Sequence, residues 1–367
     1  MSPSRRALPR LFAAALILLL AACRAAPSAA PDEPEQVQTQ TAEPAQTASA
    51  APSEARTAEP ATTGHADPPL RFTFPDPGPA PESLWRPPLY DVPWALGPND
   101  HFYFARPIAA DEVNWPLADY RYGGIFFSSD IVHTGVDIPT PKGTPVIAAG
   151  SGRVIWAGYG LYSGTDDPED PYGLAVTIRH DFGWQGQRLI TVYAHLDEID
   201  VVNGQIVKTG DLLGLVGTTG KTTGPHLHFE VRLERNSYYA TLNPELWLVP
   251  PQGWGVLVGQ LRNTNGSFLT EQDVTVRNLE TSQTWTVRSY GQTAVNGDSY
   301  YKENLALSDL PAGSYEISID YLEDHYTQEI EIRPGAITYF TFRGEFGYRL
   351  RLPAPPDVED LLPAFNP

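Results

Sequence analysis

Short apolar or alternating runs, each bounded by Gly, Pro, Asp or Asn, recur along most of the chain, and no convincing helical stretch lies among them. Runs of this length and punctuation are typical of β-strands. A first group lies at 145–149, 153–156, 175–179, 189–194, 212–216 and 227–233, and a second at 255–261, 273–277, 284–289, 314–319, 328–332 and 337–342. The sequence therefore predicts an all-β fold with two successive domains.

The length and charge of the chain narrow its class further. A chain of 367 residues suits about two domains plus unstructured segments. It carries 44 acidic against 25 basic residues, a formal charge of −19. This acidity argues against a nucleic-acid partner, because phosphate binding needs a basic face. It favours an acidic, soluble, extracellular surface.

The N-terminus has the pattern of an export signal. Arg5, Arg6 and Arg10 precede or adjoin an apolar run at 11–20, which is too short to span a bilayer of roughly 30 Å. We expect a signal peptide over residues 1–22. The sequence Leu-Ala-Ala-Cys ending at Cys23 resembles the lipobox of bacterial lipoproteins, in which this cysteine is lipidated. The alternative is an ordinary cleavage site beside an incidental cysteine. Because Cys23 is the only cysteine, no disulfide can form within the chain.

Three further segments have little periodicity. Residues 23–69 are rich in Ala, Pro, Thr, Glu and Ser, and we expect a disordered tether there. Residues 70–122 are rich in Pro and aromatic residues, which favours an irregular lead-in packed on the next domain. The alternative is a segment that occludes the active site in a latent form. The Pro-rich tail at 347–367 is expected to be exposed.

Four of the eight histidines fall in three compact motifs. His133 and Asp137 enclose Thr-Gly-Val, His195 follows Tyr-Ala, and His226 and His228 flank one leucine. Residues two apart on a strand project to the same face, so His226 and His228 should point together into one polar groove.

His133 and Asp137 require a bend to act together. Gly135 and Pro139 argue against a helix. On a straight strand residues four apart would be separated by about 13 Å, too far to share one ion. We therefore expect the chain to bend near Gly135, which glycine permits. Two histidines with one carboxylate form the ligand set of a catalytic zinc, with the fourth position open.

The stretch 133–232 resembles the M23 family of peptidoglycan endopeptidases, with their lysostaphin-like or LytM-type domains. The family's His-x-x-x-Asp motif is matched by His133 and Asp137, and its His-x-His motif by His226 and His228. Its middle histidine is matched by His195. The connecting sequence also agrees, with Gly-Thr-Pro-Val at 143–146, Ala-Gly-Ser-Gly at 149–152, Gly-Asp at 210–211 and Gly-Thr-Thr-Gly at 217–220.

The resemblance implies roles for these residues. His133, Asp137 and His228 would bind Zn²⁺, and His195 and His226 would be catalytic histidines beside the metal; which of the two is the base stays open. It further implies an antiparallel-sheet peptidase domain at 123–250. In some members of the family an upstream Asn fills the open zinc position and keeps the enzyme latent, and Asn99 and Asn114 are the candidates for such a residue here. The segment 251–346 is expected to be a β-sandwich, and it resembles the carboxypeptidase-regulatory or transthyretin-like family in Asp-Leu-Pro-Ala-Gly-Ser-Tyr at 309–315 and the later Pro-Gly at 334–335.

The implied function is a zinc-dependent endopeptidase that hydrolyses amide bonds in peptidoglycan stem peptides or cross-bridges through metal-activated water. It would be secreted and held to the bacterial membrane by a lipid, facing the cell wall, and its sandwich could bind an envelope protein. One alternative is a catalytically silent wall-binding activator of a partner amidase. Another is an adhesin or carbohydrate-binding lipoprotein that functions through the sandwich.

Two other polar features are expected to be structural. His180 precedes a glycine-containing turn and is interpreted as a structural or solvent-facing histidine. The acidic run at 166–170 is interpreted as a solvated loop, although it could bind calcium or steer an amine-bearing peptide.

Overall fold

The computed structural model describes residues 88–108, 120–125, 132–291 and 295–354. All of them belong to one compact unit of the chain. The expected signal peptide, Cys23 and the expected tether lie outside these residues. In the described ranges no helix is long and apolar enough to cross a membrane. The helical segments there are single 3-10 turns, and the regular structure is otherwise strand, which confirms the all-β prediction.

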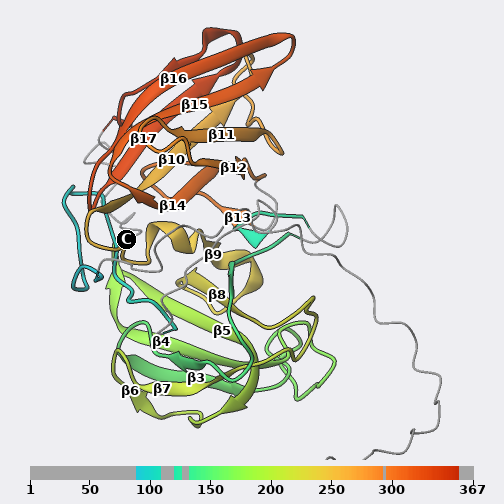
Figure 1. Cartoon of the computed structure of the whole chain (residues 1–367). Helices are drawn as coiled ribbons and strands as arrows, with labels where there is room; N and C mark the ends of the chain where they lie inside the picture. Colours follow the sequence, from blue (N-terminus) through green and yellow to red (C-terminus); the bar gives the residue numbers. More distant parts are fainter. Residues whose placement is uncertain (1–87, 109–119, 126–131, 292–294, 355–367) are drawn as a thin grey trace, which may run out of the picture. The chain divides into compact units, whose positions relative to one another are not determined.

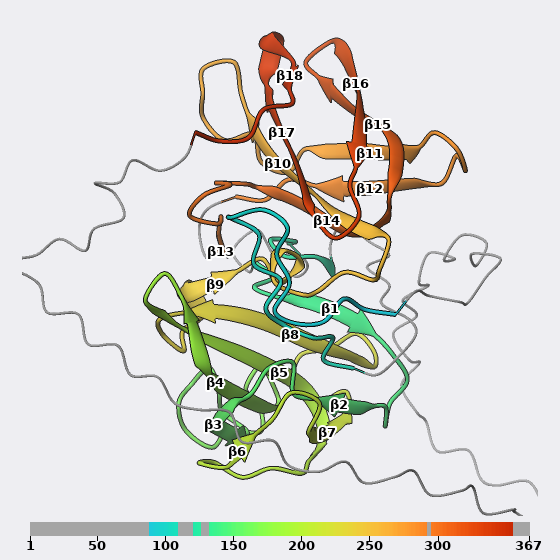
Figure 2. The ribbon, with the colours of Figure 1, turned by 90° about the vertical axis from the view of Figure 1, so that its left-hand side faces the viewer.

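Ten strands form the first sheet, which we call the main sheet. Its central path is β13-β9-β8-β5-β4-β3-β6, while β1 pairs with β8 and β7 pairs with both β2 and β5. Figure 2 shows β1 beside β8, with β5 and β4 following. Every pair is antiparallel except β13 with β9. The strands are β1 (Val136–Pro139), β2 (Pro145–Ile147), β3 (Gly152–Gly158), β4 (Leu174–Trp184), β5 (Gln187–Ile199), β6 (Ile206–Val207), β7 (Leu212–Val216), β8 (His226–Leu233), β9 (Thr241–Leu242) and β13 (Val295–Asn296).

Two four-stranded sheets follow, which we call the sandwich (Figure 1). Their orders are β14-β10-β17-β18 and β12-β11-β15-β16. Side chains from both sheets, among them Leu257, Phe340 and Ile317, share one buried core. The strands are β10 (Trp254–Arg262), β11 (Asp273–Asn278), β12 (Thr284–Arg288), β14 (Leu305–Pro311), β15 (Gly313–Tyr321), β16 (Asp324–Ile332), β17 (Ile337–Arg343) and β18 (Tyr348–Arg349).

The main sheet and one sheet of the sandwich also share a core. Phe104 from the described part of the lead-in and Trp247 after β9 pack in the same apolar cluster as Val258 of β10 and Ile337 of β17. The parallel pair of β13 with β9 ties residues 295–296, which lie between strands of the sandwich in the sequence, into the main sheet. The domain boundary expected near residue 250 stays a prediction, because β13 lies after residue 250 in the sequence but belongs to the main sheet.

Candidate metal centre and active site

Antiparallel pairing brings two of the expected metal ligands face to face. Asp137 of β1 lies directly opposite His228 of β8. His133, just before β1, places its Nε2 2.9 Å from Asp137 Oδ1 and 2.9 Å from His228 Nδ1. His228 Nδ1 is also 2.9 Å from Asp137 Oδ1. All three side chains are buried. One ligand atom from each lies within 4.8 Å of the others, so the donor set fits a single divalent ion.

The chain bends at Gly135, as expected, but glycine is needed there for a different reason. A Cβ at Gly135 would lie 2.4 Å from the Phe229 carbonyl oxygen and 2.9 Å from His228 Cε1. The residue is required for close approach of β1 to β8, rather than for an unusual backbone angle.

Second partners hold each histidine ligand in one orientation. The Nδ1–H of His133 donates to the Arg121 carbonyl oxygen at 2.9 Å, which leaves Nε2 for a metal. The Nε2–H of His228 donates to Glu230 Oε1 at 3.1 Å, which leaves Nδ1 for the same metal. Such partners fix the tautomer and ring orientation of a metal-binding histidine.

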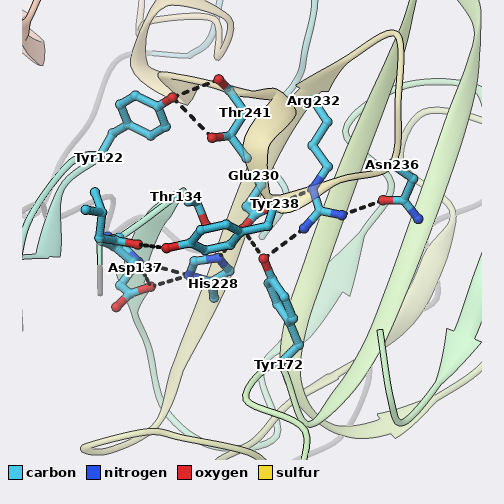
Figure 3. A network of polar contacts seen from close by, with 12 residues as sticks. Tyr122, Thr134, Asp137, Tyr172, His228, Glu230, Arg232, Asn236, Tyr238 and Thr241 are labelled. Carbon is cyan, nitrogen blue, oxygen red and sulfur yellow. Dashed lines mark hydrogen bonds and ion pairs between the residues drawn. The ribbon is translucent and has the colours of Figure 1, made fainter. Parts of the chain in front are cut away.

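Glu230 is the centre of a buried polar network, shown in Figure 3. Besides His228, its carboxylate accepts hydrogen bonds from Thr134 Oγ1 at 2.5 Å, Tyr172 Oη at 2.8 Å and Arg232 Nε at 2.6 Å. Burial alone would raise the pKa of Glu230, but the Arg232 guanidinium and the His228 donor outweigh it and lower the pKa to about 2. Glu230 therefore stays an anion behind His228.

The electrostatics of the ligands favour a cation. Burial would lower the pKa of His228, but Asp137 and Glu230 outweigh that effect and raise the pKa to about 9. Burial likewise opposes ionisation of Asp137, yet His133 and His226 hold its pKa well below the ordinary value. Two carboxylates thus stabilise positive charge at this point, and a metal ion would compete with a proton for His228.

The two remaining motif histidines face the same site. The Nδ1–H of His195 donates to the Thr219 carbonyl at 2.8 Å, and that of His226 donates to the Gly224 carbonyl at 2.9 Å. Each Nε2 is left as an acceptor, and the ring centroids lie 4.8 Å apart. Burial, then the neighbouring His226 and His228, lowers the pKa of His195 to about 3, so its ring is neutral near pH 7. His195 also holds a left-handed φ of 62°, a strained backbone angle for such a residue.

These five residues line one cavity of about 610 Å³. The lining also includes Lys221 and a group of tyrosines, namely Tyr120, Tyr162, Tyr172, Tyr238 and Tyr239. Asn99 is not among the lining residues, and Asn114 lies outside the described part of the chain. The cavity lining therefore combines a cluster that could hold a metal ion, two proton acceptors and several tyrosines.

His180 and the acidic run at 166–170 are both interpreted from the sequence as structural features, and the structure agrees for His180 but not for Asp170 within the run. His180 is buried, with its ring nitrogens 3.1 Å from the Ser151 carbonyl and 2.9 Å from Thr191 Oγ1, in agreement with a structural role. The solvated-loop interpretation is wrong for Asp170, which is buried and accepts bonds from the main-chain N–H groups of Tyr162 and Tyr172. Asp170 shapes the loop that carries one wall of the cavity.

Sequence reasoning did not identify Arg121, Tyr172, Glu230 or Arg232 as residues that support the site. The alternation that pairs His226 with His228 continues to Glu230 and Arg232, so the signal for these two was present in the motif. Arg121 and Tyr172 lie in irregular segments, where no spacing rule applies.

Comparisons with known proteins agree with this geometry. The model of peptidase family M23 matches residues 131–240. The DD-carboxypeptidase/endopeptidase Mpg of Neisseria meningitidis is 40% identical over 127 residues, which cover 35% of this chain and 26% of Mpg. The peptidoglycan DD-endopeptidase ShyB of Vibrio cholerae is 42% identical over 106 residues, 29% of this chain and 21% of ShyB. The chain thus spans about a quarter of the length of these relatives.

A solved structure, the catalytic domain of lysostaphin from Staphylococcus simulans, is 31% identical, with 34% of this chain and 86% of that chain covered and a TM-score of 0.30. The segment matched by the family model contains His133, Asp137, His195, His226 and His228. Residues 131–240 of this chain are therefore similar to a peptidase M23 domain.

Proposed function

We propose that this chain is a zinc-dependent endopeptidase that hydrolyses amide bonds in the stem peptides or cross-bridges of peptidoglycan. The observation that carries the proposal is the convergence of His133, Asp137 and His228, with mutual distances of 2.9 Å, on the floor of a cavity. The M23 match and the activities for which Mpg and ShyB are named support this substrate class.

The proposed roles follow from the chemistry of each group. Two imidazoles and one carboxylate suit Zn²⁺, which when bound polarises a carbonyl and activates water. His133 Nε2, His228 Nδ1 and Asp137 would hold it. The neutral Nε2 of His195 or His226 would take the proton of the attacking water and return it to the leaving nitrogen. The tyrosines and Lys221 would hold the peptide across the cavity.

The main alternative is a catalytically silent factor that binds wall and activates a partner amidase. Such a factor needs neither a metal nor a proton acceptor. The presence of all five polar residues, with their rings and carboxylate held by second partners, favours the enzyme.

We also propose that the protein is lipid-anchored through Cys23 and faces the cell wall, with residues 23–69 as a tether. Replacing Cys23 with Ser should move the protein from the detergent-rich phase to the aqueous phase and remove labelling by a radioactive fatty acid. Unchanged partitioning and labelling of the Cys23→Ser protein would contradict the anchor.

The test of the enzyme uses isolated peptidoglycan and the mature protein without Cys23 and the tether. Mass spectrometry of released fragments should show new peptide ends, absent with His133→Ala and with His226→Ala. Zinc content should fall in His133→Ala and stay at the parental level in His226→Ala. A zinc-loaded parent that cuts no wall type would favour the activator instead.

A further inference from the structure

We infer that the sandwich is a positioning element of the metal centre, because it fixes the carbonyl group that orients His133. The inference rests on the proposed function only in that His133 is a metal ligand. It assigns a role to the part of the chain that follows the M23 match.

The first step is the contact between His133 and residues 121–124. The Arg121 carbonyl accepts the His133 Nδ1–H at 2.9 Å. On the main chain, Gly123 N donates to the His133 carbonyl at 2.8 Å, and His133 N donates to the Gly124 carbonyl at 2.8 Å. This short segment therefore sets both the backbone and the ring of the ligand.

The second step is the side chain of Arg121, which is buried. Its Nη1 donates to Glu245 Oε2 at 2.6 Å. Glu245 is fully buried, and the same oxygen accepts the main-chain N–H of Ser308 at 2.7 Å. Ser308 belongs to β14 of the sandwich. The strand β14 therefore orients the Glu245 carboxylate, which in turn binds Arg121.

The third step is the neighbouring residue, Tyr122. Its Oη donates to the Thr241 carbonyl of β9 at 2.8 Å and accepts the N–H of Asn296 in β13 at 2.8 Å. Its ring packs edge-on against Tyr290, with centroids 5.3 Å apart. Gly123 touches the same ring, since a Cβ there would lie 2.1 Å from Tyr290 Cβ.

Arg121 is thus clamped by Glu245, which in turn accepts the Ser308 N–H of β14. Tyr122 is clamped by Thr241, Tyr290 and Asn296. The carbonyl of Arg121 is the second partner of His133. Loss of a partner of this kind typically lowers metal affinity by about 10–100-fold. Weakening the clamp should therefore weaken metal binding, although no sandwich residue is a ligand.

The experiment compares two buried arginines, of which Arg121 reaches β14 through Glu245 and Arg106 binds Asp309 of β14 directly. Arg121→Met removes the clamp. Arg106→Met removes a matched pair, because Arg106 donates to Asp309 Oδ1 at 2.5 Å and Oδ2 at 3.1 Å, and Asp309 follows Ser308. Full-length chains in detergent are titrated with Zn²⁺ against a chelator, and their visible spectra are recorded with Co²⁺. Thermal unfolding of each chain is measured in parallel.

Arg121→Met is expected to lose about tenfold or more in Zn²⁺ affinity and to show an altered Co²⁺ spectrum. Arg106→Met should lose stability and keep the parental affinity and spectrum. Arg121→Lys, which keeps a donor for Glu245, should recover part of the loss. If Arg121→Met does not fold, Glu245→Gln takes its place with the same expectation.

Parental affinity in a folded Arg121→Met or Glu245→Gln chain would overturn the inference. An equal loss in Arg106→Met would do so as well, because the effect would then follow stability alone. A parent that bound no Zn²⁺ would contradict the proposed function together with this inference, whereas the preceding outcomes contradict the inference alone.

Discussion

Glu230 is a fully buried carboxylate with four side-chain donors around it, one of which is His228. Its Oε1 accepts three of these bonds and its Oε2 accepts the bond from Arg232. A neutral amide of the same shape cannot replace both carboxylate oxygens as acceptors, because its NH₂ group would face one of the donors. The charge of Glu230 is therefore as important as its shape.

We expect Glu230→Gln to fold and to lose about 10–100-fold in Zn²⁺ affinity, because His228 loses its fixed orientation. Glu230→Ala should in addition lose roughly 3–5 kcal/mol of unfolding free energy, because it leaves Arg232 buried with neither its anion nor a side-chain acceptor at this position. Chelator competition and urea unfolding measure the two effects. The control is Glu234→Gln, which changes an exposed partner of Arg188. Parental affinity in Glu230→Gln would show that the network does not position His228.

The burial of His180 should make the stability of the chain depend on pH, whether or not a metal is bound. Burial lowers the pKa of His180 from 6.5 to about 4 in the folded chain. Between these values the unfolded chain binds a proton that the folded chain does not. The free energy of unfolding should therefore fall as the pH drops from 6.5 to 4, by roughly 3 kcal/mol in all.

His180→Gln keeps a donor for the Ser151 carbonyl but cannot titrate. Its unfolding free energy, measured in urea at several pH values, should fall less steeply than that of the parent below pH 6.5. Since only the difference between the two chains is interpreted, the other histidines do not enter the comparison. Equal slopes would mean that His180 binds a proton equally well in the folded and unfolded chains, and would contradict the prediction.

At the level of elements, the geometry of the proposed metal ligands Asp137 and His228 depends on how closely β1 approaches β8. The limiting contact is the one between Gly135 and the Phe229 carbonyl. Gly135→Ala must push the strands apart or tilt β1, and either movement separates Asp137 from His228. We expect Zn²⁺ affinity to fall by about tenfold or more.

The matched control for this change is Gly291→Ala. A Cβ at Gly291 would meet nothing nearer than Thr270 Cγ2 at 3.8 Å, which is an ordinary contact. Chelator competition on both variants should show a loss for Gly135→Ala alone. A Gly135→Ala chain with parental affinity would mean that the strands tolerate a wider spacing than the ligand distances indicate.

The same elements show what the sequence could predict. The alternation in 226–233 correctly placed His226 and His228 on one strand, with Leu227 and Phe229 in the core. The strand β14 was not expected, because Ser308 and Asp309 interrupt its apolar run. These two residues are buried because Glu245 and Arg106, far away in the chain, bind them. Partners supplied by tertiary structure leave no local pattern, and the same holds for the contact of Arg121 with His133.

At the level of the whole molecule, the cores of the main sheet and of one sandwich sheet are continuous. Phe104, Trp247 and Val249 pack in one cluster with Val256 and Ile337. The buried ion pair of Arg106 with Asp309 crosses the same junction, and so does the hydrogen bond from the Ser308 N–H to Glu245, the buried partner of Arg121. Two parts joined in this way cannot unfold separately without exposing shared apolar surface and unpaired charges.

We therefore expect the folded part of the chain to unfold in one cooperative heat-capacity peak. We expect Zn²⁺ to move this whole peak to higher temperature. A ligand that binds only the folded state adds about 2.7 kcal/mol of stability at a hundred times its dissociation constant. Calorimetry with and without Zn²⁺ measures the shift, and His133→Ala, which lacks a ligand, should show none. Two peaks of which Zn²⁺ moves only one would mean that the sandwich unfolds by itself. In that case the sandwich could unfold while the metal centre stayed folded, and it would not hold the Arg121 carbonyl against His133. A single shifted peak is therefore the behaviour that the positioning role requires.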